Sequence, residues 1–396
     1  MQGLADALEL ATPGSASTAP SVSARLEAFL DRTPLPTPFL AMDLSVVART
    51  YDELVRALPD CAIYYAMKAN PLPDVVDVLA RAGSAFDIAS QAELDQCLRA
   101  GIPAERLSFG NTIKTSAAIA RAHRHGVGIF AVDCASELNK VAAHAPGARV
   151  SVRLATDGRG AEWPLSRKFG CDVGMAFDLL ARAPGLGLEP FGVSFHVGSQ
   201  QTDPGAWDRP IAESAALFER LRRRGVELQC LNLGGGFPAP YRTSLPPISS
   251  YGKAIERSVQ RHFGSRGPQL MVEPGRHLVA RAGLLRTEVV LVANRSSEGL
   301  RWVYLDCGKF GGLAEAGDEA IKYPLRVMGR TGRPLRAALA GPTCDSADVL
   351  YEKTPCCLPA DLAEGDRVDI LSAGAYTHTY AAVGFNGFPP LTAVAI

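Results

Sequence analysis

The sequence lacks the charge pattern and the apolar length expected of a protein that binds nucleic acid or a membrane. Its 41 basic and 41 acidic residues give a formal net charge of zero, and no long basic run interrupts this balance. A polyanionic surface is bound by clustered basic residues, which are not seen here. No apolar stretch is long enough to span a bilayer. We therefore expect no nucleic-acid partner and no membrane.

The cysteines also lack a pattern. There are nine, an odd number, and none shows the spacing of metal ligands. Cys356 and Cys357 are adjacent, which is a poor geometry for a structural zinc site. We expect no metal, reduced thiols and a cytoplasmic location. Residues 1–22 lack the charged-then-apolar order of a secretory signal and include small residues, prolines and serines, so we expect a flexible tail there.

Apolar strand-like runs alternate with helical patterns from residue 41 to residue 278. Eight runs, from IYYAMK to LMVEP, follow the opening strand TPFLAMDL. Strand and helix in alternation indicate parallel strands, and eight is the number that closes a TIM-type (β/α)8 barrel. The alternative is an open doubly wound sheet, although no Gly-x-Gly-x-x-Gly turn follows an early strand. Residues 279–396 read as strands with short turns, which predicts an all-β sandwich or barrel domain that packs with residues 23–40.

Polar residues and glycines recur where the predicted barrel strands end. Each alone has an ordinary structural explanation: a snorkelling lysine, a hydrogen-bonded histidine, a tight glycine turn or an ion pair. Their common position favours a functional site, since a barrel carries its chemistry at that rim. The residues are Lys68, Asp87, Arg153, His196, Ser199, Gly234, Gly235, Gly236, Glu273 and Arg276.

Together these residue types suit one cofactor. A partly desolvated Lys68 would lose part of its positive charge and could form a Schiff base with an aldehyde. Three glycines let backbone N–H groups approach a phosphate, and Arg276 adds a charged donor. Glu273 could keep a pyridine nitrogen protonated while His196 stacks on the ring. Aldehyde, phosphate and pyridine describe pyridoxal 5′-phosphate (PLP).

The sequence resembles the fold type III PLP-dependent decarboxylases, and most closely their ornithine/lysine group. The resemblance runs from about residue 37 to the C-terminus and rests on eight motifs in the family's order. They are YYAMKAN, FDIAS, FHVGSQ, GGGFP, EPGR, GPTCDSADVL, GAYTHTY and FNGF. The segment LDCGKFGGLAEAGDEAIKYP is similar to bacterial members.

The resemblance implies roles for the matching residues. Lys68 would carry the cofactor, Glu273 would face the pyridine nitrogen, and His196 would stack on the ring. The phosphate ligands would be Ser199, Gly234, Gly235, Gly236, Arg276 and Tyr376, with Asp87 and Arg153 in support. Tyr376 is also a candidate for contact with the substrate. Cys344 would donate a proton after carbon dioxide leaves, and Asp345 would bind the distal amine, both in the site of a neighbouring subunit of a homodimer. Asp318 and Glu319 are a second pair of candidates for that amine.

The predicted activity is therefore decarboxylation of L-ornithine and/or L-lysine to putrescine or cadaverine. Diaminopimelate decarboxylase is an alternative, although Asp345-Ser346 after Cys344 favours a plain amine over a zwitterionic end. A racemase is disfavoured by Glu273, and a non-catalytic homologue by the presence of Lys68, Glu273 and Cys344. The two substrates differ by one methylene, worth about 1–3 kcal/mol, so ornithine, lysine and related diamino acids of a specialised pathway stay open.

Overall fold

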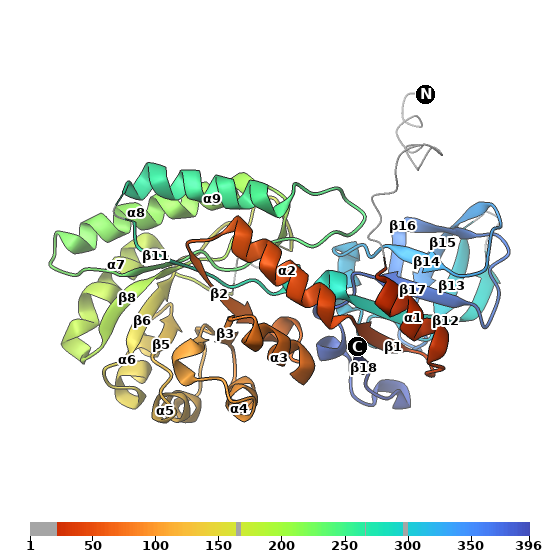
Figure 1. Ribbon diagram of the computed structural model, residues 1–396, viewed down its shortest axis with the longest axis horizontal. Helices are drawn as coiled ribbons and strands as arrows, with labels where there is room; N and C mark the ends of the chain where they lie inside the picture. Colours follow the sequence, from red (N-terminus) through yellow and green to blue (C-terminus); the bar gives the residue numbers. More distant parts are fainter. Residues whose placement is uncertain (1–21, 164–167, 266, 296–299) are drawn as a thin grey trace.

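The computed structural model of the chain describes residues 22–163, 168–265, 267–295 and 300–396. The tail predicted over residues 1–22 lies outside them, apart from Val22. The molecule is elongated, with a barrel at one end and a curled sheet at the other (Figure 1).

Eight parallel strands form the barrel. They are β2 (Cys61–Ala66), β3 (Ala85–Ile88), β4 (Leu107–Phe109), β5 (Ile129–Val132), β6 (Arg149–Arg153), β8 (Glu189–Ser194), β10 (Cys230–Asn232) and β11 (Gln269–Val272). The barrel is closed in the order β10-β11-β2-β3-β4-β5-β6-β8. Closure confirms the predicted (β/α)8 barrel, and the alternative of an open doubly wound sheet is wrong.

Helices cover the outside of the barrel. They are α2 (Leu44–Ala57), α3 (Pro73–Arg81), α4 (Gln91–Arg99), α5 (Ser116–Arg124), α6 (Ala135–His144), α7 (Val173–Arg182), α8 (Asp208–Arg222) and α9 (Ile248–Phe263). Ser90, Thr115 and Asp172 cap three of them, each accepting a hydrogen bond from the N–H three residues on. Each cap stands at the end of a segment that leaves a barrel strand and fixes where the following helix begins.

A separate two-stranded ribbon lies beside the barrel. It pairs β7 (Ala161–Trp163) with β9 (Ser199–Gln201), with Trp163 opposite Ser199. The sequence patterns did not predict this ribbon. It fixes the backbone of Ser199 next to the end of β8.

The second sheet has eight strands, both parallel and antiparallel. They are β1 (Phe39–Met42), β12 (Gly283–Asn294), β13 (Arg301–Leu305), β14 (Leu325–Val327), β15 (Pro334–Ala340), β16 (Val349–Pro359), β17 (Arg367–Leu371) and β18 (Thr392–Ala395). Between the barrel and this sheet lies the short helix α10 (Arg276–Val279). A barrel followed by a β region is the fold class predicted from the sequence, which is confirmed.

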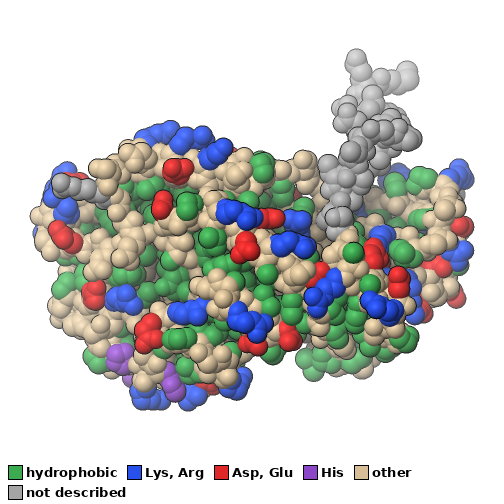
Figure 2. Space-filling view, in the orientation of Figure 1, with side chains coloured by type: hydrophobic (Ala, Val, Ile, Leu, Met, Phe, Trp, Pro, Cys, Tyr) green, Lys and Arg blue, Asp and Glu red, His purple; other side chains and the backbone are tan. Residues whose placement is uncertain are grey.

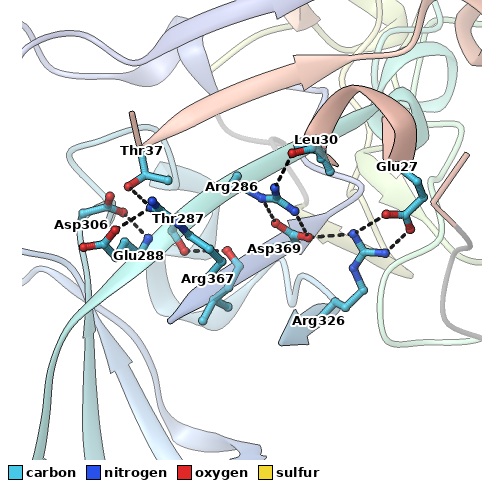
Figure 3. Close-up of polar contacts among 11 residues, drawn as sticks. Glu27, Leu30, Thr37, Arg286, Thr287, Glu288, Asp306, Arg326, Arg367 and Asp369 are labelled. Atoms are coloured by element: carbon cyan, nitrogen blue, oxygen red, sulfur yellow. Dashed lines mark hydrogen bonds and ion pairs between the residues drawn. The ribbon is translucent and has the colours of Figure 1, made fainter. Parts of the chain in front are cut away.

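The start of the described chain packs on the second sheet. Strand β1 pairs antiparallel with β12 and parallel with β18. Helix α1 (Ala24–Arg32) lies beside it, and Glu27 in this helix pairs with Arg326 of the sheet. Asp369 lies between Arg326 and Arg286 and accepts hydrogen bonds from both (Figure 3). The described chain therefore starts at the second sheet, then forms the barrel, and ends with the remaining strands of the second sheet.

The surface matches the balanced composition. Basic and acidic side chains are interspersed over the face shown in Figure 2. In the described part of the chain, no helix combines the length and apolarity needed to cross a membrane.

Candidate active site

The predicted polar residues gather at the ends of the barrel strands. Lys68 follows β2, Asp87 lies in β3, His196 follows β8, and Glu273 follows β11. Because the strands are parallel and closed into a barrel, these ends meet at one mouth. The glycines 234 to 236 follow β10, and Arg153 ends β6, so they lie at the same mouth.

Lys68 stands in a single helical turn, η1 (Met67–Ala69), that the second sheet holds in place. The Asn70 side chain donates a hydrogen bond to the Gly374 carbonyl at 2.7 Å. The Tyr376 N–H donates to the Ala69 carbonyl at 2.8 Å. Since Asn70 is fully buried, losing these bonds would leave polar groups unpaired away from water. The position of Lys68 thus depends on both ends of the molecule.

The Lys68 amine forms an ion pair with Asp87. The distance from Nζ to Oδ2 is 3.7 Å, and the two side chains are 50 % and 4 % exposed. The pair therefore lies at the boundary between the barrel interior and solvent. Asp87 Oδ1 is buried and has no hydrogen-bond partner among the described residues. A buried carboxylate oxygen left in this way is a position that a ligand donor could satisfy.

The charge of Lys68 differs from the sequence-based expectation. Burial alone would lower the pKa of Lys68, but Asp87, Tyr376 and Glu273 outweigh it and raise the pKa above its ordinary value. Half of the side chain is exposed, which limits the effect of burial. The expectation that Lys68 loses positive charge is therefore wrong: the amine is a cation and must give up a proton before it can act as a nucleophile. Burial and the nearby Glu273 raise the pKa of Asp87, which the charge on Lys68 opposes.

Glu273 is fixed by a residue that the sequence analysis missed. The Asn232 side-chain amide donates to Glu273 Oε1 at 2.5 Å, and its oxygen accepts the Gly234 N–H at 2.9 Å. Asn232 is 5 % exposed. Asn232 stands at the end of a predicted strand, directly before LGGG, and this position is the sequence feature that could have identified it as a site residue. The amide joins the carboxylate to the glycine turn.

His196 is neutral in this site. Burial, with the positive charges of Arg153 and Lys68, lowers its pKa to about 3. Its Nδ1 accepts the Gly198 N–H at 3.0 Å, which leaves the proton on Nε2. The ring is therefore an uncharged aromatic surface, suited to stacking on a flat ligand.

The three glycines are required by close approach of the backbone. A side-chain carbon on Gly234 would lie 2.0 Å from the Phe195 carbonyl oxygen, and one on Gly236 would lie 2.5 Å from that of Gly198. These two glycines also have φ of 67° and 104°, which other residues rarely adopt. A carbon on Gly235 would lie 2.6 Å from the Glu273 carbonyl oxygen and 3.2 Å from His196 Nε2. Only glycine lets these backbone segments approach each other so closely.

Arg276 makes a second buried cluster. Its guanidinium donates to Ser199 Oγ, to the Tyr241 hydroxyl and to both oxygens of Glu315. It also lies over the Tyr376 ring, 5.0 Å from the ring centre. Arg276, Ser199 and Tyr376 are among the site residues predicted from the sequence, whereas Tyr241 and Glu315 are not.

Cys344 and Asp345 stand apart from the residues of the barrel mouth. Both are exposed, in the loop between β15 and β16. The Cys344 N–H donates to Asn386 Oδ1 at 3.0 Å, and Asp345 accepts the Ala347 N–H at 2.8 Å. Neither forms a hydrogen bond or ion pair with Lys68 or Glu273 among the described residues of this chain.

Asp318 and Glu319 differ in what they contact. Glu319 accepts hydrogen bonds from three successive N–H groups of β16, from Glu352 to Thr354, at 2.6 to 2.9 Å. Burial would raise the pKa of Glu319, but these bonds and one from the Thr354 hydroxyl lower it. Asp318 is exposed. Within the chain Glu319 is therefore engaged with β16, and Asp318 is the more available carboxylate.

Similarity to known proteins agrees with this site. Residues 44–280 match the family described as "Pyridoxal-dependent decarboxylase, pyridoxal binding domain". The lysine/ornithine decarboxylase of Selenomonas ruminantium is 34 % identical over 355 residues, which are 89 % of this chain and 88 % of that protein.

The chain belongs to the pyridoxal-dependent decarboxylases. The mouse ornithine decarboxylase is 32 % identical and covers 88 % of this chain and 78 % of its own length. A structure of lysine/ornithine decarboxylase from Vibrio vulnificus with cadaverine is 32 % identical, with a TM-score of 0.84. It covers 95 % of this chain and 100 % of that one. The predicted family, the fold type III ornithine/lysine decarboxylases, is confirmed.

Proposed function

We propose that this decarboxylase acts on a basic L-amino acid, L-ornithine and/or L-lysine, and releases carbon dioxide with putrescine or cadaverine. The observation that carries the proposal is the convergence of Lys68, Asp87, His196 and Glu273 beside the glycine turn at the barrel mouth. The relatives named lysine/ornithine decarboxylase support the choice of a diamino acid.

The residues fit PLP as the cofactor. The glycine turn would offer backbone N–H groups to a phosphate, and Ser199, Arg276 and Tyr376, which lie together, would be further ligands. Lys68 would hold the cofactor covalently, the neutral His196 would stack on its ring, and Glu273 would face the ring nitrogen. Asp87 and Arg153 would balance charge around Lys68. When bound, PLP supplies an electron sink for the charge left as carbon dioxide departs.

A second copy of the chain would complete the site. Cys344 is the proposed proton donor and Asp345 the proposed ligand of the distal amine, yet both are exposed and unconnected to Lys68 within the chain. Exposed Val383, Phe385 and Phe388 lie close to Cys344 in the chain fold, because Asn386 binds the Cys344 N–H. An exposed apolar group of this kind is typical of an interface. We therefore propose a homodimer in which each subunit lends Cys344 and Asp345 to its partner, with Asp318 as a second candidate for the amine.

The domain bounds and the location complete the proposal. We assign residues 41–278 to the PLP-binding barrel and residues 279–396, with 23–40, to the β domain. All nine cysteines are unpaired thiols, which supports a cytoplasmic enzyme.

The decisive experiment incubates the purified protein and PLP with ornithine, lysine, arginine or diaminopimelate separately. Carbon dioxide and amine are measured for each. We expect ornithine and/or lysine to give the diamine, and the Lys68→Ala variant to lose both turnover and the visible absorbance of the bound cofactor. Turnover of diaminopimelate alone would refute the proposed substrate. A Lys68→Ala protein that keeps the cofactor absorbance would refute the role of Lys68.

A further inference from the structure

The guanidinium of Arg276 uses all of its hydrogen-bond donors on neighbours within the chain. An arginine has five N–H donors in a planar fork. The two outer nitrogens, Nη1 and Nη2, reach Glu315 Oε2 and Oε1 at 2.6 and 2.5 Å. Nη1 also reaches the Tyr241 hydroxyl at 2.8 Å. The remaining edge, Nε and Nη2, shares a single acceptor, Ser199 Oγ, at 3.3 and 3.1 Å.

The two edges of the fork therefore differ. Glu315 holds the outer edge through two short charge-assisted bonds, which fix the plane of the guanidinium as well as its position. The edge toward Ser199 has longer bonds to one shared oxygen. The Nε and Nη2 donors of this second edge are the ones that could also bind an anion, because their bonds to Ser199 Oγ are longer. Ser199 lies on β9, beside the barrel mouth, so an anion at the mouth would be within reach of this edge.

Glu315 and Arg276 are both buried, with side chains 7 % and 3 % exposed. Glu315 belongs to η6 (Ala314–Glu319), between β13 and β14 of the second sheet, whereas Arg276 begins α10, shortly after the last barrel strand. The ion pair thus joins the segment between barrel and second sheet to a loop of the region that follows the barrel. Removing one partner of a buried pair leaves the other charge uncompensated.

We propose that Glu315 is a positioning residue for the cofactor phosphate. It holds the Arg276 guanidinium so that the Nε and Nη2 edge faces the space beside Ser199 and the glycine turn. Arginine has a long, flexible side chain, and its value as an anion ligand depends on a preset fork. This inference rests on the proposed function, because it takes the phosphate of PLP as the anion.

The test compares PLP with pyridoxal, which has the same aldehyde and ring but no phosphate. Dissociation constants for both are measured by cofactor absorbance with the wild-type protein, Glu315→Gln and a control, Asp369→Asn. Asp369 is a matched control because it is fully buried and pairs with two arginines in the second sheet, away from the barrel strands (Figure 3).

We expect Glu315→Gln to lower the preference for PLP over pyridoxal about tenfold or more, and Asp369→Asn to leave it unchanged. Glu315→Asp keeps the negative charge but shortens the side chain by one methylene, so it should give an intermediate preference for PLP. It also provides the test if Glu315→Gln does not fold. An unchanged preference in the Glu315 variants would overturn the proposal. A raised preference would overturn it too, since Glu315 would then compete with the phosphate. A wild-type protein that binds neither compound would instead refute the proposed function.

Discussion

The titration of His196 gives the sharpest quantitative prediction. An imidazole has a pKa of 6.5 in an unfolded chain, and the folded site lowers it to about 3. Above pH 6.5 His196 is neutral in both states and does not lower the free energy of unfolding. As the pH falls from 6.5 toward 3, the free energy of unfolding decreases, because the unfolded chain binds a proton at His196 and the folded chain does not. Between pH 7 and pH 5 the loss is about 2 kcal/mol, from 1.36 kcal/mol per pH unit over the range below 6.5.

The assay is urea unfolding of the wild-type protein and of His196→Phe at both pH values, without added cofactor. Phenylalanine keeps a flat aromatic ring but cannot titrate, and His196→Asn separates the loss of the ring from the loss of the proton site. We expect both variants to lose about 2 kcal/mol less than the wild type between pH 7 and pH 5. Parallel losses, equal within about 0.5 kcal/mol, would refute the reasoning that burial and neighbouring cations keep the ring neutral.

Further predictions concern groups around the site. Asn232→Ala should lower the free energy of unfolding by about 1–3 kcal/mol and weaken cofactor retention in dialysis, because Glu273 loses its buried partner; wild-type values for both would contradict this role. Cys344→Ala should slow turnover or yield an aldehyde by-product alongside the amine, and an unchanged rate and product would leave Cys344 without a chemical role. Asp345→Ala should raise KM for diamino acids more than for a neutral analogue, whereas equal effects would remove it from the amine site. Mixing the inactive Lys68→Ala protein with the slower Cys344→Ala protein should raise the rate of amine formation above that of either protein alone if the sites are shared between subunits, and no increase after verified subunit exchange would argue against sharing.

The sequence predicted the barrel because its information is local. Each barrel strand is a short apolar run followed by a helical pattern, and the burial of each run does not depend on knowing its partner. The strand ends then brought Lys68, Asp87, His196 and Glu273 to one mouth without any coordinates. The ribbon of β7 and β9 was not predicted from the sequence, because both strands are only three residues long and partly polar.

Side-chain partners were harder to predict, since they depend on turns rather than on periodicity. Glu315, Asp318 and Glu319 lie within five residues, and local pattern cannot separate them. Asp318 and Glu319 have φ of 51° and 59°, a left-handed turn that directs the Glu319 side chain to β16. The Glu315 side chain instead contacts Arg276, 39 residues earlier in the sequence. The charge of Lys68 was misjudged because the sequence placed Asp87 and Glu273 at the same mouth but could not show that they lie close enough, with Tyr376, to outweigh burial.

The region that follows the barrel holds residues of the candidate site in place. It supplies the Gly374 carbonyl that holds Asn70, the Tyr376 backbone that holds Ala69, and the Glu315 carboxylate that holds Arg276. These contacts hold the segments that carry the proposed cofactor lysine and the proposed phosphate arginine, which follow the neighbouring strands β2 and β11. A barrel cut from the chain after residue 280 would keep Asn232, which holds Glu273 and the glycine turn, but lose the groups that hold the segment of Lys68 and the side chain of Arg276. The arrangement of the candidate site therefore depends on residues from both parts of the chain, and the barrel alone does not account for it.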